Sequence, residues 1–256
     1  GHDGLADDHG APVMSPFGVR VKPMLRVWGT GQDEIYAAYS NTVFRRSTSN
    51  GAFEPMVTFD DLAVPNEHVF IAELAGTGAD DLWIAGARVL QGPCPLVVHK
   101  TASGLEHVVD ADYDPTSRGC VARDGSQTFD DTALGWALGV ATVAAEDVIV
   151  NFNGKGVVRV QKSASDYTFT STEPSIVTSA DAMSSFIRSV WYGDGDTWLS
   201  SWGTVFRRAG GTDDFVLSRI SRDVSPVFSP IYRVRGTSKT NLWAIGDQHA
   251  LHKTTP

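Results

Sequence analysis

Side chains that could bind a ligand occur in the turns between short apolar segments of the chain. Trp202, Arg88, Asn153, Asp247 and His249 all lie in turns of this kind. Amides, carboxylates, cations and exposed aromatic rings are the groups that fix a polar ligand such as a sugar. Trp202 is the most suggestive of them, although packing of its indole under a neighbouring loop would explain it equally well.

A second group of candidate ligand-binding residues combines arginines with a glutamate and a tryptophan. Each stands one or three positions before a glycine, and the group comprises Arg26, Trp28, Glu73, Arg233 and Arg235. Residues two apart on a strand point to the same side, so these side chains could converge. They would form either a pocket that favours anions or an ion-pair network that fills the space between the strands.

No sequence motif of a known catalytic or metal site accompanies these candidates. The chain has no Gly-x-Ser-x-Gly, P-loop or His-Glu-x-x-His pattern. His249 and His252 are three apart, and this offset on a strand directs them to opposite faces. Glu73, Asp247 and His249 are the one set that we nominate for a hydrolase or lyase. We therefore favour a binding protein over an enzyme and expect no cofactor and no metal.

Composition limits the class of partner. The 256 residues carry a formal net charge of −9, which repels nucleic acid and anionic lipid surfaces. No window approaches the roughly 18 consecutive apolar residues that a membrane helix needs. We expect a monomer whose partner is a glycan, another small polar molecule or a surface protein.

The two cysteines bear on the cellular compartment. Cys94 and Cys120 are 26 positions apart, and a pair is too few for a structural zinc site. We favour a disulfide over two unrelated buried thiols, and a disulfide implies an oxidising compartment. Residues 1–10 are polar and without periodicity, which suggests a tether after a cleaved export signal. Both features favour a secreted, periplasmic or cell-surface protein.

A repeat organises the chain. The segments VWGTGQDEIY, LAGTGADDLW and VRGTSKTNLW begin at positions 27, 74 and 234, weaker copies begin at 139 and 190, and TVFRR occurs at both 42–46 and 204–208. The aromatic or aliphatic anchors of the five copies are 47, 66, 49 and 45 residues apart; they are Tyr36, Trp83, Ile149, Trp198 and Trp243. The long second interval predicts an insertion, and both cysteines fall inside it.

The period and the strand signals together predict the fold. Each unit contains short β-branched and aromatic runs bounded by turn residues, and no sustained helical periodicity. About 47 residues accommodate four short strands, the size of a propeller blade. We predict an all-β, five-bladed propeller of four-stranded antiparallel blades at about 22–66, 67–132, 133–183, 184–228 and 229–256. Residues 11–21 would supply the last strand of the fifth blade.

The pattern W-G-T-x-x-[DN]-[DEN]-[LI]-[WY], followed by a TVFRR-like strand, resembles the blade repeats of exported bacterial β-propellers that are abundant in myxobacteria. Five units near 47 residues are also similar in architecture to tachylectin-type propellers, whose own sugar-binding motif the chain does not match. The resemblance implies an exported propeller and says little about activity. We expect an exported ligand-binding protein, with a protein-interaction scaffold and a hydrolase or lyase as alternatives.

Overall fold

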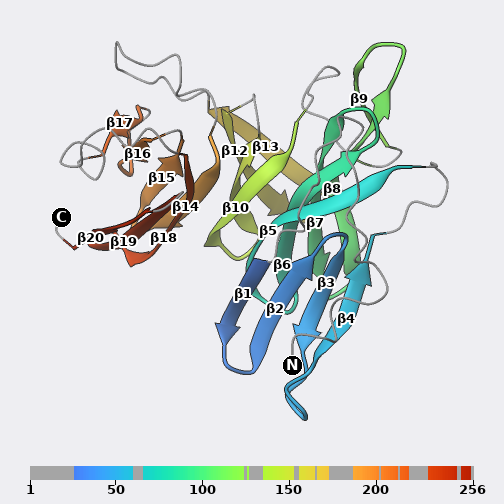
Figure 1. Cartoon of the computed structure of the whole chain (residues 1–256), viewed down its shortest axis with the longest axis horizontal. Helices are drawn as coiled ribbons and strands as arrows, with labels where there is room; N and C mark the ends of the chain where they lie inside the picture. Colours follow the sequence, from blue (N-terminus) through green and yellow to red (C-terminus); the bar gives the residue numbers. More distant parts are fainter. Residues whose placement is uncertain are drawn as a thin grey trace.

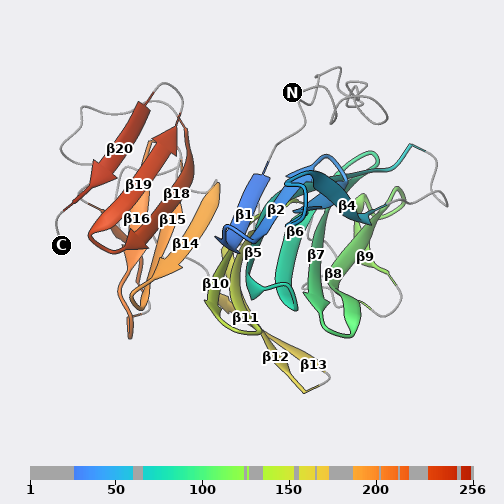
Figure 2. The ribbon, with the colours of Figure 1, turned by 90° about the horizontal axis from the view of Figure 1, so that it is seen from below.

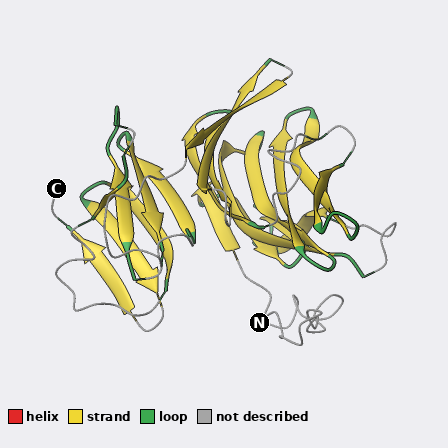
Figure 3. Cartoon of the chain, turned by 90° about the horizontal axis from the view of Figure 1, so that it is seen from above, coloured by secondary structure: helices red, strands yellow, loops and turns green. Residues whose placement is uncertain are grey.

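The fold is that of a computed structural model, which describes residues 26–59, 66–123, 126, 135–152, 156–164, 166–172, 187–201, 203–212, 214–218, 230–246 and 249–254. Every regular element in these ranges is a β-strand, as Figure 3 shows. They contain no helix, and hence none that is long and apolar enough to cross a membrane.

The strands form five antiparallel sheets, which are the blades of the propeller (Figure 1). Blade 1 contains β1 (Arg26–Gly31), β2 (Glu34–Tyr39), β3 (Thr42–Arg46) and β4 (Phe53–Thr58). Blade 2 contains β5 (His68–Gly78), β6 (Asp81–Val89), β7 (Pro93–Thr101), β8 (Gly104–Asp114) and β9 (Gly119–Ala122). Blade 3 contains β10 (Ala137–Ala144), β11 (Asp147–Phe152), β12 (Gly156–Ser163) and β13 (Asp166–Thr172). Blade 4 contains β14 (Ser189–Gly193), β15 (Asp196–Ser200), β16 (Val205–Arg208) and β17 (Val216–Leu217), and blade 5 contains β18 (Ile231–Ser238), β19 (Asn241–Gly246) and β20 (His249–Lys253).

The first strands of consecutive blades lie next to one another. β1 contacts β5, β5 contacts β10, β10 contacts β14, and β14 contacts β18. In Figure 2, β1, β5, β10 and β14 lie toward the middle of the molecule. The prediction of an all-β, five-bladed propeller is therefore confirmed. The predicted closing strand at 11–21 lies outside the described residues.

The anchors of the repeat form much of the core between blades. Tyr36, Trp83, Ile149 and Trp198 are at most 2% exposed, and each contributes to an apolar cluster shared with the next blade. Trp243 is the exception at 41% exposed.

The Gly-Thr of the repeat carries a β-bulge. A Cβ on Gly76 would overlap the backbone of Asp81, so close backbone approach accounts for this glycine. The strand register shifts between Gly76 and Gly78, and the bulged Thr77 donates a 2.6 Å hydrogen bond to the Asp81 carboxylate. Thr30 and Glu34 repeat this contact in blade 1 at 2.8 Å. The motif thus fixes an acidic side chain at the start of the second strand.

The insertion in blade 2 adds a fifth strand. β9 pairs with the end of β8, and a disulfide between Cys94 of β7 and Cys120 of β9 ties it back to the sheet. Both cysteines are at most 2% exposed. The predicted disulfide is confirmed, and blade 2 differs from the four-stranded prediction because the inserted residues fold as an additional hairpin.

Candidate functional site

Three arginines and one glutamate from the innermost strands meet at the centre of the propeller. Glu73 of β5 forms ion pairs with Arg235 and, at 3.4 Å, with Arg233, both from β18. Arg26 of β1 and Arg233 donate hydrogen bonds of 2.5 and 3.3 Å to the same carbonyl oxygen, that of Ala72. The structure therefore brings together four of the residues that the sequence grouped.

Burial and repulsion shape the charges of this central cluster. Burial lowers the pKa of Arg233 to about 10. Repulsion from Arg26 and Arg235 lowers this pKa further, whereas attraction to Glu73 raises it. Burial likewise lowers the pKa of Arg26. Trp28 is not part of the cluster: its ring lies 5.7 Å from that of Tyr36 and packs against the core between blades 1 and 2.

Arg88 serves an ion-pair network inside blade 2. Its guanidinium donates to both oxygens of Asp110, at 2.5 and 3.1 Å, and to Glu67 at 3.0 Å. All three side chains are at most 6% exposed. Burial alone would lower the pKa of Arg88, but hydrogen bonds and charge from Asp110 and Glu67 raise it above its ordinary value. Arg88 is thus committed to holding blade 2 together.

Asp110 also orients a histidine that sequence reasoning missed. Nδ1 of His107 lies 2.7 Å from the Asp110 carboxylate, and the imidazole is 41% exposed. Residues three apart on a regular strand point to opposite faces. In β8, however, Val109 pairs with Val97 and His107 pairs with Val98, so Val108 is an extra residue that forms a β-bulge. The bulge places His107 and Asp110 on the same side of the strand.

Three of the predicted ligand-binding residues, Asn153, Trp202 and Asp247, lie outside the described residues. His249 begins β20, and its ring lies against Gly246. In the parts of the chain that the structure describes, no three His, Cys, Asp or Glu side chains form a group that could hold a metal ion.

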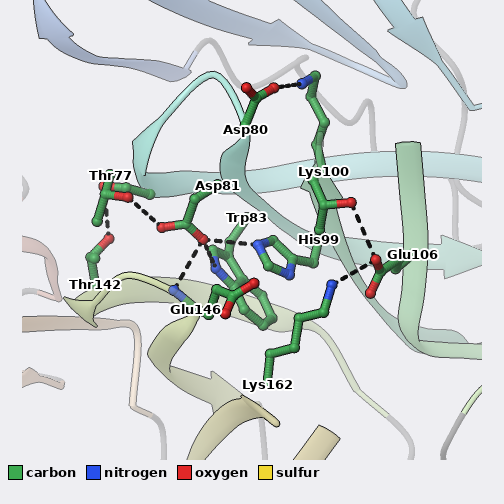
Figure 4. Close-up of polar contacts among 12 residues, drawn as sticks. Thr77, Asp80, Asp81, Trp83, His99, Lys100, Glu106, Thr142, Glu146 and Lys162 are labelled. Atoms are coloured by element: carbon green, nitrogen blue, oxygen red, sulfur yellow. Dashed lines mark hydrogen bonds and ion pairs between the residues drawn. The ribbon is translucent and has the colours of Figure 1, made fainter. Parts of the chain in front are cut away.

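A hydrogen-bond network joins blades 2 and 3 (Figure 4). Asp81 accepts from Nε1 of Trp83 at 2.9 Å and lies 2.8 Å from Nε2 of His99. The indole and imidazole rings stack with centroids 4.0 Å apart. On the side of blade 3, Lys162 donates a 2.7 Å hydrogen bond to Glu106.

Tyr167 of β13 completes this network. Its hydroxyl lies 2.8 Å from Nδ1 of His99 and donates at 2.5 Å to Glu106. Its ring meets the ring of Trp83 edge-on at 5.9 Å. The side chains of Tyr167 and Lys162 therefore cover the stacked pair of blade 2.

Between blades 3 and 4, the same side of the propeller contains a groove of about 460 Å³. Ile149 and Arg159 form its wall on blade 3, and Tyr192, Thr197 and Arg208 form its wall on blade 4. The remaining lining residues are Val143, Gly195, Ala209, Gly210, Gly211 and Thr212. Cation, phenol, hydroxyl and apolar surface therefore face one hollow, a combination suited to a polar ligand.

Sequence reasoning did not select Tyr192 or Arg208 as site residues, because both occupy positions of the repeat. Two signals in the sequence mark the groove. Ile149 stands where four units have Trp or Tyr, and Gly210 and Gly211 follow the TVFRR segment of blade 4.

No protein-family model matches the chain, and no curated protein matches its sequence. Its fold is similar to that of a luciferin-regenerating enzyme, with 10% identity, a TM-score of 0.55, and coverage of 91% of this chain and 77% of that one. A chain of the mitotic checkpoint complex matches at 10% identity and a TM-score of 0.50, covering 87% of this chain. Regucalcin from Agrobacterium tumefaciens, a calcium-binding protein, matches at 10% identity and a TM-score of 0.43, covering 80% of this chain. The chain spans only 57% of the checkpoint chain and 61% of regucalcin. The first two likenesses support the propeller fold, and the function has to be argued from the sites themselves.

Proposed function

We propose that the protein is an exported binding protein that takes a small polar ligand, in first place a glycan, in the groove between blades 3 and 4. The open groove itself carries the proposal. Its volume of about 460 Å³ falls in the range of small-molecule sites, and its lining offers hydrogen-bonding groups beside an aromatic ring.

A comparison of two blade interfaces explains why the groove exists. Trp83 pairs with His99 in blade 2 as Ile149 pairs with Arg159 in blade 3. Replacing an indole by an isoleucine side chain removes part of the floor of the interface.

The covering side chains are lost as well. In blade 3 the anchor Ile149 pairs with Arg159, and Lys162 lies three residues after Arg159. In blade 4 the anchor Trp198 pairs with Arg207, and the residue three positions later is Gly210. Lys162 also pairs with Tyr167 across the hairpin, whereas the described pairing of β16 with β17 ends at Arg207 and Val216.

The surface that each blade presents to the preceding blade also changes, from apolar in blade 3 to polar in blade 4. Val148 pairs with Val160 in blade 3, and both are fully buried. Thr197 and Arg208 are the corresponding pair in blade 4. Giving up apolar contact at an interface costs stability, so a ligand-binding role accounts for a change that packing would disfavour.

Two further observations support the proposal. The Cys94–Cys120 disulfide favours an oxidising compartment and agrees with the resemblance to exported bacterial propellers. Glu73 is ion-paired with two arginines, which gives a hydrolase centred on it no support.

A protein-binding surface is the second candidate function. Trp243 and Ile245 are 41% and 45% exposed on β19, and adjacent exposed apolar side chains favour a partner. Residues 11–21 compete for the same face if they complete blade 5. Deletion of that segment should then increase binding of an apolar dye, whereas unchanged dye binding would leave this face to a protein partner.

A glycan array tests the groove directly. The labelled protein should bind a subset of glycans, and Tyr192→Leu should weaken that binding about tenfold or more, the equivalent of about 1.4 kcal/mol. Tyr232→Leu is the matched control, because Tyr232 is exposed on β18 and does not line the groove. Equal binding by the wild-type protein and Tyr192→Leu would place the site elsewhere, and an array without any binding would refute glycan recognition.

A further inference from the structure

The groove between blades 3 and 4 has one charged group whose charge the described residues leave unbalanced. Arg159 and Arg208 are the only charged side chains among the described residues that line it. Arg159 is held by Asp147 through hydrogen bonds of 2.9 and 2.5 Å, and these bonds raise its pKa. Arg208 has no carboxylate partner among the described residues.

The contacts of Arg208 leave its guanidinium available. It donates two long hydrogen bonds, of 3.4 Å to Thr172 and 3.5 Å to Thr197. One side of the guanidinium lies over the buried ring of Phe215, 5.2 Å from its centroid, which holds it in place as a cation–π contact. A guanidinium has five N–H donors in a planar fork, so most of them can serve a ligand.

The corresponding residues of blades 1 and 2 have a structural task that Arg208 lacks. Arg46 donates to the carbonyl oxygen of Gln32, at 2.9 Å, in the turn between β1 and β2. Lys100 bonds to Ala79 and Asp80 in the turn between β5 and β6. These cations tie the third strand to the first turn of their own blade, whereas the hydrogen bonds of Arg208 go to threonine hydroxyls.

Acidic groups near the groove are occupied elsewhere. Asp196 forms hydrogen bonds to Arg207 at 2.8 Å and to the backbone N–H of Gly210 at 3.1 Å. Asp194 accepts the backbone N–H of Lys239, in blade 5, at 2.8 Å. Neither carboxylate neutralises Arg208.

We infer that the ligand of this groove is a sugar that carries an anionic group, which Arg208 binds. The inference rests on the proposed function and adds the class of ligand. Carboxylate, sulfate and phosphate groups each present two oxygen atoms at a spacing that a guanidinium matches with two parallel hydrogen bonds. Because the chain has a net charge of −9, its long-range field repels polyanions, and one charged sugar unit fits better than a highly charged polymer.

Calorimetric titration with matched sugars tests the inference. The probes are glucose, glucuronate, glucose 6-sulfate and glucose 6-phosphate, each bound to the wild-type protein and to Arg208→Met. We expect at least one anionic sugar to bind about tenfold more tightly than glucose, and the order of the three anions identifies the group. Arg208→Met should remove the preference, so that the anionic sugars bind this variant no more tightly than glucose does.

Two controls keep the result specific. Arg46→Met removes the corresponding cation of blade 1 and should leave the preference intact. Arg208→Lys keeps the charge but loses the planar fork, and should retain only part of the preference. Equal melting temperatures for the variants exclude unfolding as the cause of any loss.

The outcomes separate the inference from the proposed function. Equal binding of glucose and the anionic sugars, or an anion preference that survives in Arg208→Met, would overturn the inference while the groove remains a sugar site. Absence of binding by all four probes, together with an empty glycan array, would overturn both.

Discussion

The imidazole of His99 stacks on the indole of Trp83, with the ring centroids 4.0 Å apart and the ring planes 10° from parallel. Trp243 and His252 repeat this pair in blade 5 at 4.0 Å and 6°. His99 is fully buried, and both of its ring nitrogens have hydrogen-bond partners, Asp81 and Tyr167. The stacked pair is therefore also the polar link between blades 2 and 3.

Replacement of His99 by phenylalanine tests this link. The His99→Phe variant keeps a stacked ring but leaves Asp81 and Tyr167 without their shared partner in a buried site. We expect a loss of about 2 to 4 kcal/mol in the free energy of unfolding, measured by urea denaturation. His252→Phe is the control, because its ring is exposed and its one hydrogen bond goes to Asn241; it should cost less than about 1 kcal/mol. Equal costs would show that the polar link contributes nothing.

Stability should fall in acid through two carboxylates of the same network. Burial opposes ionisation of Asp81, but hydrogen bonds led by that from His99 lower its pKa from 3.8 to about 2. Burial also opposes ionisation of Glu106, but hydrogen bonds led by that from Lys162 lower its pKa from 4.5 to about 2. Because both values are lower in the folded state, the stabilisation is complete above pH 4.5 and is lost as the pH falls toward 2.

The melting temperature measured between pH 7 and pH 2 checks this dependence. It should begin to fall near pH 4.5, and Glu106→Gln should flatten the curve in that window, since the amide does not titrate. A Glu106→Gln curve parallel to that of the wild-type protein would contradict the assignment.

Deletion of residues 11–21 tests closure of the propeller. Blade 5 has three described strands where blades 1, 3 and 4 have four, and we predict that this N-terminal segment provides its fourth. The deleted protein should have a much lower melting temperature. Deletion of residues 1–10 alone is the control and should change little, whereas an unchanged melting temperature after loss of 11–21 would refute the closing strand.

Removal of the disulfide should destabilise blade 2. A cross-link that closes a loop of 26 residues contributes about 3 to 4 kcal/mol by restricting the unfolded chain. We expect the double variant Cys94→Ala, Cys120→Ala to lose about this much in urea denaturation. An unchanged unfolding free energy would mean that the sheet pairing of β8 with β9 suffices to hold the insertion.

The repeat made the architecture predictable, because one pattern recurs at five matching phases and each copy predicts the same strands. The central cluster followed from the same register: strand alternation alone grouped Arg233, Arg235 and Glu73. The disulfide was predictable from the lone pair of cysteines in one insertion.

Other features depend on local departures from regular geometry. The alternation of side chains on a strand separates His107 from Asp110, and the bulge at Val108 that unites them has no signature in a single sequence. Asp81 bonds to His99 on the neighbouring strand and accepts from the backbone N–H of Glu146 in blade 3, and neither contact follows from the repeat pattern. The sequence does not single out Arg208, because its proposed role depends on the absence of covering side chains in blade 4.

The groove between blades 3 and 4 also affects the dynamics of the propeller. Where Tyr167 and Lys162 clamp blade 2 to blade 3, blade 4 offers Gly210 and a polar wall. Regions with fewer packed side chains open at a lower free energy than the rest of a fold. Amide hydrogens of β14 and β16 should therefore exchange with solvent sooner than those of β6 and β7, and an occupied groove should slow that exchange. The absence of covering side chains, which leaves room for a ligand, would thus also make the interface between blades 3 and 4 open more readily than the interface between blades 2 and 3.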